Sequence, residues 1–174
     1  MSKIIIFRGK AATGKTLLSN AVSGKLKIPV IRNDDIYDVV AANYDLDFQL
    51  IKGISYDIIP AIVNTNIELG NDLILDIGLA HQDYIKQFVD KLASDNAKIT
   101  MFLCVCSDDG VWCERIEERI VNPTPNQLFK SSCEALKYYD KLNLNPLEDE
   151  IVIDSVVTLD VLIDPVLEKI SNSK

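Results

Sequence analysis

The sequence predicts a three-layer α/β/α sandwich built around a five-stranded parallel sheet. Short apolar runs alternate with longer segments whose apolar residues recur at helical spacing, and a glycine-rich loop follows the first run directly. Parallel strands are typically apolar throughout, because helices cover both faces of the sheet. The alternation shows no linker, internal repeat or low-complexity stretch, so we predict a single domain over 1–174.

Five apolar segments are the expected strands, and seven segments are the expected helices. The strands should cover residues 4–7, 28–31, 73–76, 99–105 and 150–154. The helices should cover about 15–24, 34–43, 48–69 and 85–93, one around 114–119, one ending near 139, and one over 158–170. Pro60 should kink or break the third helix. Ligands of such sheets bind beyond the carboxyl ends of the strands, where polar residues become candidates for a site.

Composition argues against several classes of partner. The 18 Lys and Arg residues face 26 Asp and Glu residues, and the net charge of −8 disfavours a broad electrostatic hold on nucleic acid or an anionic membrane. No apolar run is long enough to cross a bilayer, and no signal peptide is recognisable, so we expect a cytoplasmic protein. The four cysteines match no common zinc spacing, and His81 alone cannot form a histidine cluster.

Residues 9–16 carry the most specific signal in the chain. They fit the phosphate-loop pattern G-x-x-x-x-G-K-[ST] at every defined position. Backbone N–H groups in such a loop turn inward around phosphate oxygens, and the positive end of the following helix adds to the attraction. We therefore predict that ATP and Mg²⁺ bind here. The expected nucleotide-binding residues are Gly9, Lys10, Ala11, Ala12, Thr13, Gly14, Lys15 and Thr16.

Carboxylates follow the second and third expected strands. Asp34 and Asp35 come after the second strand, where one of them would accept a proton from a substrate hydroxyl. Asp76 ends the third strand and, with the Thr16 hydroxyl, is the predicted Mg²⁺ ligand. The alternatives are a plain helix cap for the Asp pair and a solvated strand end for Asp76.

Two arginines are candidates for transition-state stabilisation. Arg115 and Arg119 are spaced i, i+4, so they share one face of a helix and can close over a triphosphate together with Lys15. We predict a small helical lid over about 108–126, with the proline-rich stretch after Arg119 as its hinge. The alternative is an exposed helix that carries Glu–Arg pairs.

In this order, the motifs resemble those of the small P-loop kinases grouped with the phage-type polynucleotide kinase domain, which include zeta-toxin-like, chloramphenicol and gluconate kinases. The resemblance covers essentially the whole chain and implies a P-loop NTPase fold of the nucleoside-monophosphate-kinase type. It assigns the base for the acceptor hydroxyl to Asp34, within Arg32-Asn33-Asp34-Asp35, and the phosphate-contacting lid arginine to Arg119. It places the adenine pocket near the lid and residues 143–149.

The sequence departs from this family at the acceptor side. Tyr37 and Asp38 stand where the polynucleotide kinase type has an arginine at an acceptor-phosphate site, and the loop 77–80 lacks polar side chains. We therefore expect an ATP-dependent phosphotransferase with catalytic residues Lys15, Asp34, Arg115 and Arg119 that acts on a hydroxyl of a small molecule. A polynucleotide 5′-hydroxyl kinase and a catalytically silent ATP-binding protein remain the alternatives. A GTPase-like switch is disfavoured, because neither N-K-x-D nor D-x-x-G occurs. The sequence does not indicate the oligomeric state.

Overall fold

The predicted five-stranded parallel sheet is confirmed. The computed structural model describes residues 1–123 and 126–172, and its strands lie in the order β2-β3-β1-β4-β5. All neighbouring pairs are parallel. The strands are β1 (Ser2–Arg8), β2 (Val30–Arg32), β3 (Leu73–Asp76), β4 (Ala97–Val105) and β5 (Ile151–Asp154).

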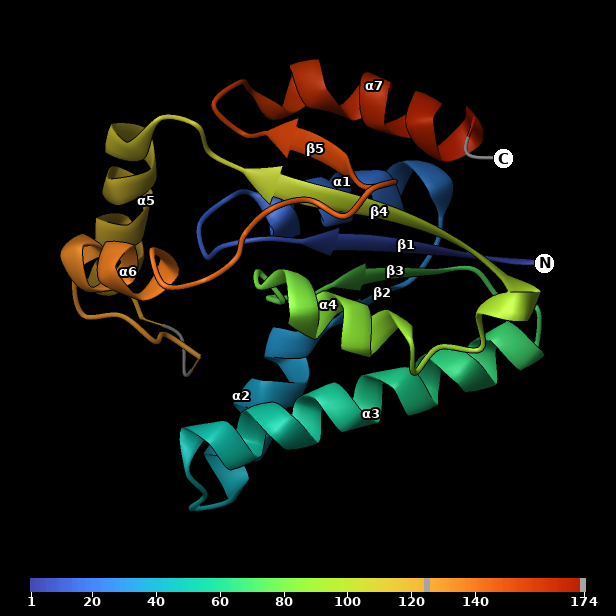
Figure 1. The fold of residues 1–174 in the computed structure, drawn as a ribbon, viewed down its shortest axis with the longest axis horizontal. Helices are drawn as coiled ribbons and strands as arrows, with labels where there is room; N and C mark the ends of the chain where they lie inside the picture. The colour runs from blue at the N-terminus through green and yellow to red at the C-terminus, as the bar shows by residue number, and fades with distance from the viewer. Residues whose placement is uncertain (124–125, 173–174) are drawn as a thin grey trace.

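Helices cover both faces of the sheet, as Figure 1 shows. They are α1 (Lys15–Leu26), α2 (Asn33–Asn43), α3 (Phe48–Glu68), α4 (Gln82–Val89), α5 (Asp109–Val121), α6 (Ser132–Tyr139) and α7 (Leu159–Asn172). Alternate residues of β1 face opposite layers. Ile4 and Ile6 pack in the cluster with α3 and α4, whereas Ile5 and Phe7 pack in the cluster with α1 and α7. Burial from both sides explains why the strand is apolar throughout.

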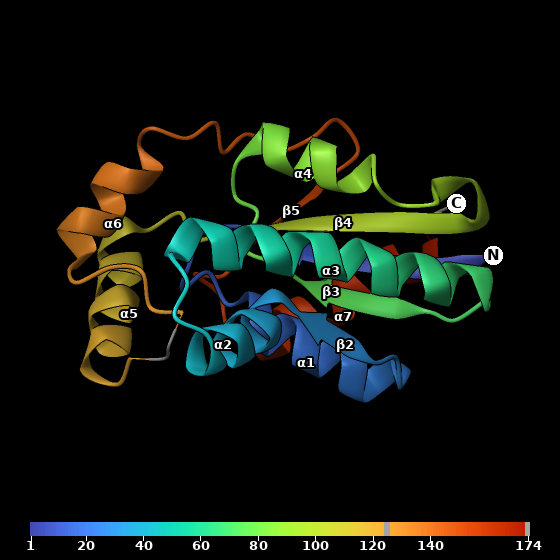
Figure 2. The same cartoon turned by 90° about the horizontal axis from the view of Figure 1, so that it is seen from below.

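The expected lid region forms a third, smaller core at the carboxyl end of the sheet. Helices α5 and α6 lie together at that end in both views (Figures 1 and 2). Trp112, Ile116 and Phe129 are buried in a cluster that packs against Ala11 and Ala12 of the phosphate loop. Thr124 and Pro125, which belong to the predicted lid and its hinge, lie outside the described residues.

Two helices run further than the sequence predicts. Helix α1 continues past Gly24, and Lys27 ends it in a left-handed conformation with φ 59°. Helix α3 continues through Pro60, so the predicted break at this residue is wrong. Pro60 lies on the buried side of α3 with Ile59 and Val63, and burial of this apolar face offsets the lost backbone hydrogen bond. Within residues 1–123 and 126–172, no helix has the length and apolar character needed to span a membrane.

Strand register brings the polar strand ends together. Asp76 of β3 lies opposite Phe7 of β1 and Arg32 of β2. The residues that follow Phe7 and Arg32 are the phosphate loop and the start of α2, so all three predicted features meet at one edge of the sheet. This confirms the convergence that the parallel-sheet topology predicts.

Candidate active site

A cavity of about 680 Å³ opens at this edge of the sheet. The phosphate loop forms its floor, and the first turns of α2 and α3 form one wall with the loop after β3. Helices α5 and α6 and the turn after β5 form the opposite wall. The cavity therefore joins segments that are far apart in the sequence, and its size suits a small-molecule site.

The phosphate loop depends on glycine at two points. Gly9 has φ 138°, and a Cβ atom there would lie 2.2 Å from the backbone oxygen of Cys104. Gly14 has φ 76° directly before α1 begins. Such left-handed positions let successive N–H groups turn toward one point. The loop thus has the backbone shape that the motif predicts.

Side chains of the loop itself hold it in shape. Lys15 Nζ donates a hydrogen bond to the backbone oxygen of Lys10 at 2.6 Å, and Thr13 Oγ1 donates to the same oxygen at 2.9 Å. The Lys15 ammonium group consequently lies over the loop, where phosphate oxygens of a nucleotide would replace the carbonyl as its partner.

Helices α5 and α6 hold the loop from outside. Trp112 Nε1 donates to the oxygen of Ala11 at 2.8 Å, and the Ala11 N–H donates to the Tyr139 hydroxyl oxygen at 2.9 Å. Lys10 Nζ lies 4.0 Å from the centre of the Trp112 ring, which fits a cation–π contact. Burial raises the pKa of Tyr139 to about 12, so its hydroxyl stays neutral. In this structure, the helices of the predicted lid region therefore support the phosphate loop.

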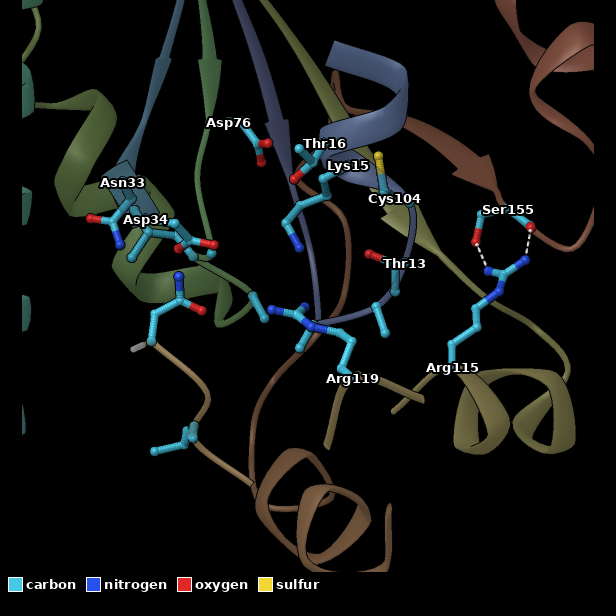
Figure 3. Close-up of a pocket in the computed structure, with 18 of the residues that line it drawn as sticks. Thr13, Lys15, Thr16, Asn33, Asp34, Asp76, Cys104, Arg115, Arg119 and Ser155 are labelled. Atoms are coloured by element: carbon cyan, nitrogen blue, oxygen red, sulfur yellow. Dashed lines mark hydrogen bonds between the residues drawn. The ribbon is translucent and has the colours of Figure 1, made fainter. Parts of the chain in front are cut away.

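Asp34 points into the phosphate end of the cavity. Figure 3 shows its carboxylate facing the Lys15 ammonium and the Arg119 guanidinium. Burial raises the pKa of Asp34, and the nearby Asp76 adds to this, whereas Lys15 and Arg119 act in the opposite direction. Asp35 lies outside the cavity lining, with an exposed side chain 3.4 Å from Arg32 Nη1. The structure thus places Asp34, and not Asp35, in the cavity beside the phosphate loop.

Thr16 and Asp76 offer hard oxygen ligands beside the loop. Both line the cavity, and Figure 3 shows their oxygens close to Lys15. Asp76 is buried and accepts one hydrogen bond, from Ser19 Oγ at 3.4 Å. The Thr16 hydroxyl has no hydrogen bond partner in the described part of the chain. A hydroxyl and a carboxylate with unused lone pairs at a phosphate loop fit Mg²⁺.

The two predicted arginines point to different parts of the cavity, although their spacing predicts that they share one helix face. Arg119 points toward Lys15 and Asp34, whereas Arg115 turns toward the turn after β5 (Figure 3). Arg115 donates hydrogen bonds to Ser155 Oγ and to the Ser155 backbone oxygen, both at 2.8 Å. These partners were available because β5 ends beside α5, a tertiary contact that helical spacing does not reveal. Arg115 therefore lies away from the Lys15–Asp34 end.

Residues 143–149 do not line the cavity, although the family resemblance predicts the adenine pocket there. Instead, the turn after β5 and the start of α7 contribute Val157, Thr158 and Leu162, next to Arg115. The predicted segment packs against Arg8, which donates to the backbone oxygen of Asn145 at 3.2 Å. The segment thus contacts the end of β1 and lies outside the cavity lining.

Arg8 forms a fully buried ion pair directly before the phosphate loop. Its Nε and Nη2 atoms each donate to a carboxylate oxygen of Glu150 at 2.6 Å. Its Nη1 donates to the backbone oxygens of Leu79 and Ala80 at 3.2 and 2.7 Å. Bidentate geometry and satisfied donors are what a buried pair requires. Arg8 thereby connects the phosphate loop to the loop after β3.

The part of the cavity that α3 lines contains residues that sequence analysis did not assign, and we call it the acceptor end. Phe48, Lys52 and Tyr56 line it from α3 at i, i+4 spacing, a signal that was present in the sequence. Tyr56 accepts a hydrogen bond from the backbone of Gly78, and burial, followed by the Asp34 charge, raises its pKa. Asn33 lines the same region, and its buried Oδ1 has no hydrogen bond partner among the described residues.

His81 has a structural partner. It precedes α4, and its Nδ1 accepts a hydrogen bond from the Asp83 N–H at 3.1 Å. Its ring lies 4.9 Å from the ring of Tyr84. Although His81 lines the cavity, its role as a helix cap accounts for its position.

Comparisons with known proteins agree with this architecture. The family model described as an AAA domain matches residues 4–137. No curated protein sequence matched the chain significantly. Many solved structures share the fold.

A proposed kinase from Chloroflexus aurantiacus J-10-fl has a TM-score of 0.80 at 20% identity, over 96% of this chain and 97% of that one. A gluconokinase from Sinorhizobium meliloti 1021 has a TM-score of 0.66 at 12% identity, over 98% and 91%. The Mycobacterium tuberculosis APS kinase, solved with AMPPNP and APS, has a TM-score of 0.68 at 12% identity, over 98% of both chains.

At these identities the structural neighbours show a shared fold, and the family model covers most of the chain. The chain belongs to the AAA domain family and has the fold of the small P-loop kinases.

Proposed function

We propose that this protein is a magnesium-dependent kinase that transfers the γ-phosphoryl group of ATP to a hydroxyl of a small molecule. The observation that carries the proposal is the position of Asp34, which faces Lys15 and Arg119 at the phosphate loop. Phosphoryl transfer needs a phosphate cradle, positive charge at the transferred group and a base at the attacking hydroxyl. One end of one cavity offers all three.

On the donor side, the loop 9–16 would hold the β- and γ-phosphates through its N–H groups and Lys15. Thr16 and Asp76 would hold Mg²⁺, which supplies charge neutralisation to the phosphates when bound. The cavity wall formed by Val157, Thr158 and Leu162 would take the nucleoside, and Arg115 lies beside it. AMPPNP bound in the APS kinase of the same fold supports ATP as the donor.

On the acceptor side, Asp34 would orient and deprotonate the hydroxyl. The hydroxyl oxygen forms a bond to the γ-phosphorus, the bond from that phosphorus to the bridging oxygen breaks, and ADP leaves with its electrons. The proton passes to the Asp34 carboxylate. Lys15 and Arg119 would stabilise the charge on the phosphoryl oxygens. The raised pKa of Asp34 suits a group that must accept a proton.

The small-molecule acceptor is favoured over a nucleic-acid end by the walls of the cavity. Tyr37 is buried against Phe48, with ring centres 5.5 Å apart, at the place that the sequence comparison assigned to an acceptor-phosphate arginine. The net charge of −8 points the same way. The gluconokinase of the same fold supports a small hydroxylated acceptor.

A transfer assay with γ-labelled ATP tests the proposal. Nucleosides, sugars, sugar acids, aromatic alcohols and oligonucleotides with free 5′-hydroxyl ends should be offered to the full chain with Mg²⁺. We expect label to appear on a small molecule, and Lys15→Ala should reduce transfer by about 10²–10³-fold because it removes a cation at the transferred group.

Transfer only to oligonucleotides would replace the small-molecule acceptor by a polynucleotide end. ATP binding by calorimetry together with no transfer to any acceptor would identify a silent nucleotide-binding protein and contradict the proposal. Lys25→Ala is the control and should leave transfer nearly unchanged, because Lys25 is exposed in the last turn of α1 and does not line the cavity.

A further inference from the structure

The cavity is unusually rich in tyrosine, and most of these rings lie beyond the phosphate loop. Five of the six tyrosines of the chain line the cavity, together with Phe48 and Phe129. The tyrosines are Tyr37, Tyr56, Tyr84, Tyr138 and Tyr139. They come from four different helices, α2, α3, α4 and α6, and face one space. Such rings offer flat apolar faces, so this end suits a ligand with a compact ring or carbon skeleton.

Rings also surround one another on the lid side of this space. Phe129 lies 5.3 Å from the ring centre of Tyr138 and 5.5 Å from that of Tyr139. Both distances are within the range of favourable aromatic contacts, so the rings form a pre-built wall. A pre-built wall favours a ligand of defined shape over a flexible chain.

Lys52 is a cationic side chain in the cavity whose position is not explained by an ion pair or by the proposed phosphoryl transfer. Four cationic side chains, Lys15, Lys52, Arg115 and Arg119, line the cavity. Two of them face Asp34, and Arg115 is bound to Ser155. Lys52 has no carboxylate within salt-bridge distance in the part of the chain that the structure describes. Its Nζ lies 5.9 Å from the centre of the Tyr84 ring.

A half-buried lysine without an anionic partner carries a cost. Removal of water around the ammonium group lowers the pKa of Lys52. A bound anion would offset that cost and form a charge-assisted hydrogen bond. The same space contains a second unmet group, because the buried Oδ1 of Asn33 has no partner among the described residues. Both groups line one cavity and are suited to a polar ligand.

The position of Lys52 on α3 sets the scale of the ligand. Lys52 stands one turn before Tyr56, about 6 Å along the helix. The Tyr56 hydroxyl accepts a hydrogen bond from the Gly78 backbone, and the charge of Asp34 contributes to its raised pKa. Tyr56 therefore lies at the end of the cavity where Asp34 would act. Lys52 thus lies about one helical turn from Tyr56, on the side of Tyr84 and Phe48. Asp34 and Lys52 line the same cavity of about 680 Å³, a size that suits a small-molecule ligand in contact with both.

We infer that the acceptor is a compact alcohol that carries an anionic group, a carboxylate or a phosphate, and that Lys52 binds this group while the tyrosine-lined walls hold the carbon skeleton. The inference rests on the proposed kinase function and specifies its acceptor. Lys52 is a specificity-determining residue in this account, whereas Lys15, Asp34 and Arg119 serve the transfer.

Calorimetric binding to the full chain, loaded with Mg²⁺ and a non-hydrolysable ATP analogue, tests the inference with matched pairs. One pair is 4-(hydroxymethyl)benzoate against benzyl alcohol, and the other is ribose 5-phosphate against ribose. The pairs separate a carboxylate from a phosphate as the anion. We expect at least one anionic member to bind about tenfold or more tighter than its neutral partner.

Variants assign the preference to Lys52. Lys52→Met should abolish the preference for the anion, Lys52→Arg should keep most of it, and Lys86→Met on the exposed side of α4 should leave it unchanged. The affinity for the ATP analogue should be the same in every variant. An unchanged affinity shows that the substitution has left the fold intact. Equal binding within both pairs, absence of binding by both anions, or a preference that persists in Lys52→Met would overturn the inference.

Transfer of label from ATP, measured on the same pairs, separates this inference from the proposed function. Selective binding of an anionic alcohol without transfer would contradict the kinase proposal and leave the anion site standing. Transfer to the neutral members as efficiently as to the anionic ones would contradict the anion site alone.

Discussion

The two ends of the cavity are built by different means. At the donor end, the proposed phosphate site is formed by one continuous segment, residues 9–16, whose backbone N–H groups would do most of the binding. The acceptor end is formed by side chains from α2, α3, α4 and α6, with only a few residues from each. A backbone site requires particular glycines and one register, whereas a side-chain site can change residue by residue. This difference explains how one fold can retain a common donor and accept different acceptors.

The comparison also indicates what connects the two ends. Arg8 lies in β1 directly before the phosphate loop, yet its guanidinium holds the backbone of Leu79 and Ala80 at the acceptor end. Glu150 neutralises it from the segment before β5. One buried side chain therefore fixes the distance between two sites that are otherwise built independently.

The largest expected effect comes from breaking this connection. Arg8→Met should lower the free energy of unfolding by about 3–5 kcal/mol, because it leaves the Glu150 carboxylate buried without its partner. Urea denaturation followed by circular dichroism measures the change. Arg8→Met combined with Glu150→Met should cost less than Arg8→Met alone, since the uncompensated charge is gone. A single-variant loss below about 1 kcal/mol would show that the pair does not hold the two ends together.

The next effect tests the reliance of the donor end on its backbone. Gly9→Ala should destabilise the protein by about 2–3 kcal/mol, because its Cβ would overlap the Cys104 carbonyl and its φ is 138°. Gly24→Ala in α1 is the matched control, since its Cβ meets nothing within 4 Å. It should stabilise the helix by about 0.5–1 kcal/mol. Equal changes in the two variants would contradict the strained loop.

The smallest effect separates the two arginines. Arg115→Met should weaken ATP binding by about three- to tenfold and leave kcat nearly unchanged, because Arg115 lies at the Ser155 end of the cavity. Arg119→Met should instead lower kcat, since Arg119 faces Lys15 and Asp34. Calorimetry and steady-state rates on both variants give the comparison. Equal losses of kcat would restore the paired role that helical spacing suggests.

Sequence patterns predicted the donor end better than the acceptor end, for physical reasons. The phosphate loop is a local backbone motif, and the positions of Asp34 and Asp76 follow from parallel register, so both could be read along the chain. The direction of Arg115 depends on where β5 ends beside α5, which is a tertiary contact. Trp112 reads as an ordinary apolar residue, although it bonds to Ala11 of the loop.

The acceptor end of the cavity could be predicted from the sequence only in part. The i, i+4 spacing of Phe48, Lys52 and Tyr56 was visible in the sequence, but helical spacing alone does not say which face of α3 turns toward the cavity. The path of α3 through Pro60 shows the same limit. Burial of one helix face outweighed the local preference of proline to end a helix.

The most direct test of the proposed transfer is Asp34→Asn, with Asp35→Asn as its neighbour control. Because burial raises the pKa of Asp34, kcat/KM for the acceptor at saturating ATP should fall on the acid side at a pH above the ordinary aspartate range, as the base becomes protonated. We predict that Asp34→Asn lowers kcat by about 10²–10⁴-fold, removes this acid limb and leaves ATP affinity nearly unchanged. Asp35→Asn should keep both the rate and the pH profile, since its side chain is exposed. An Asp34→Asn variant that weakens ATP binding but retains kcat would identify Asp34 as a metal ligand and contradict its role as the base.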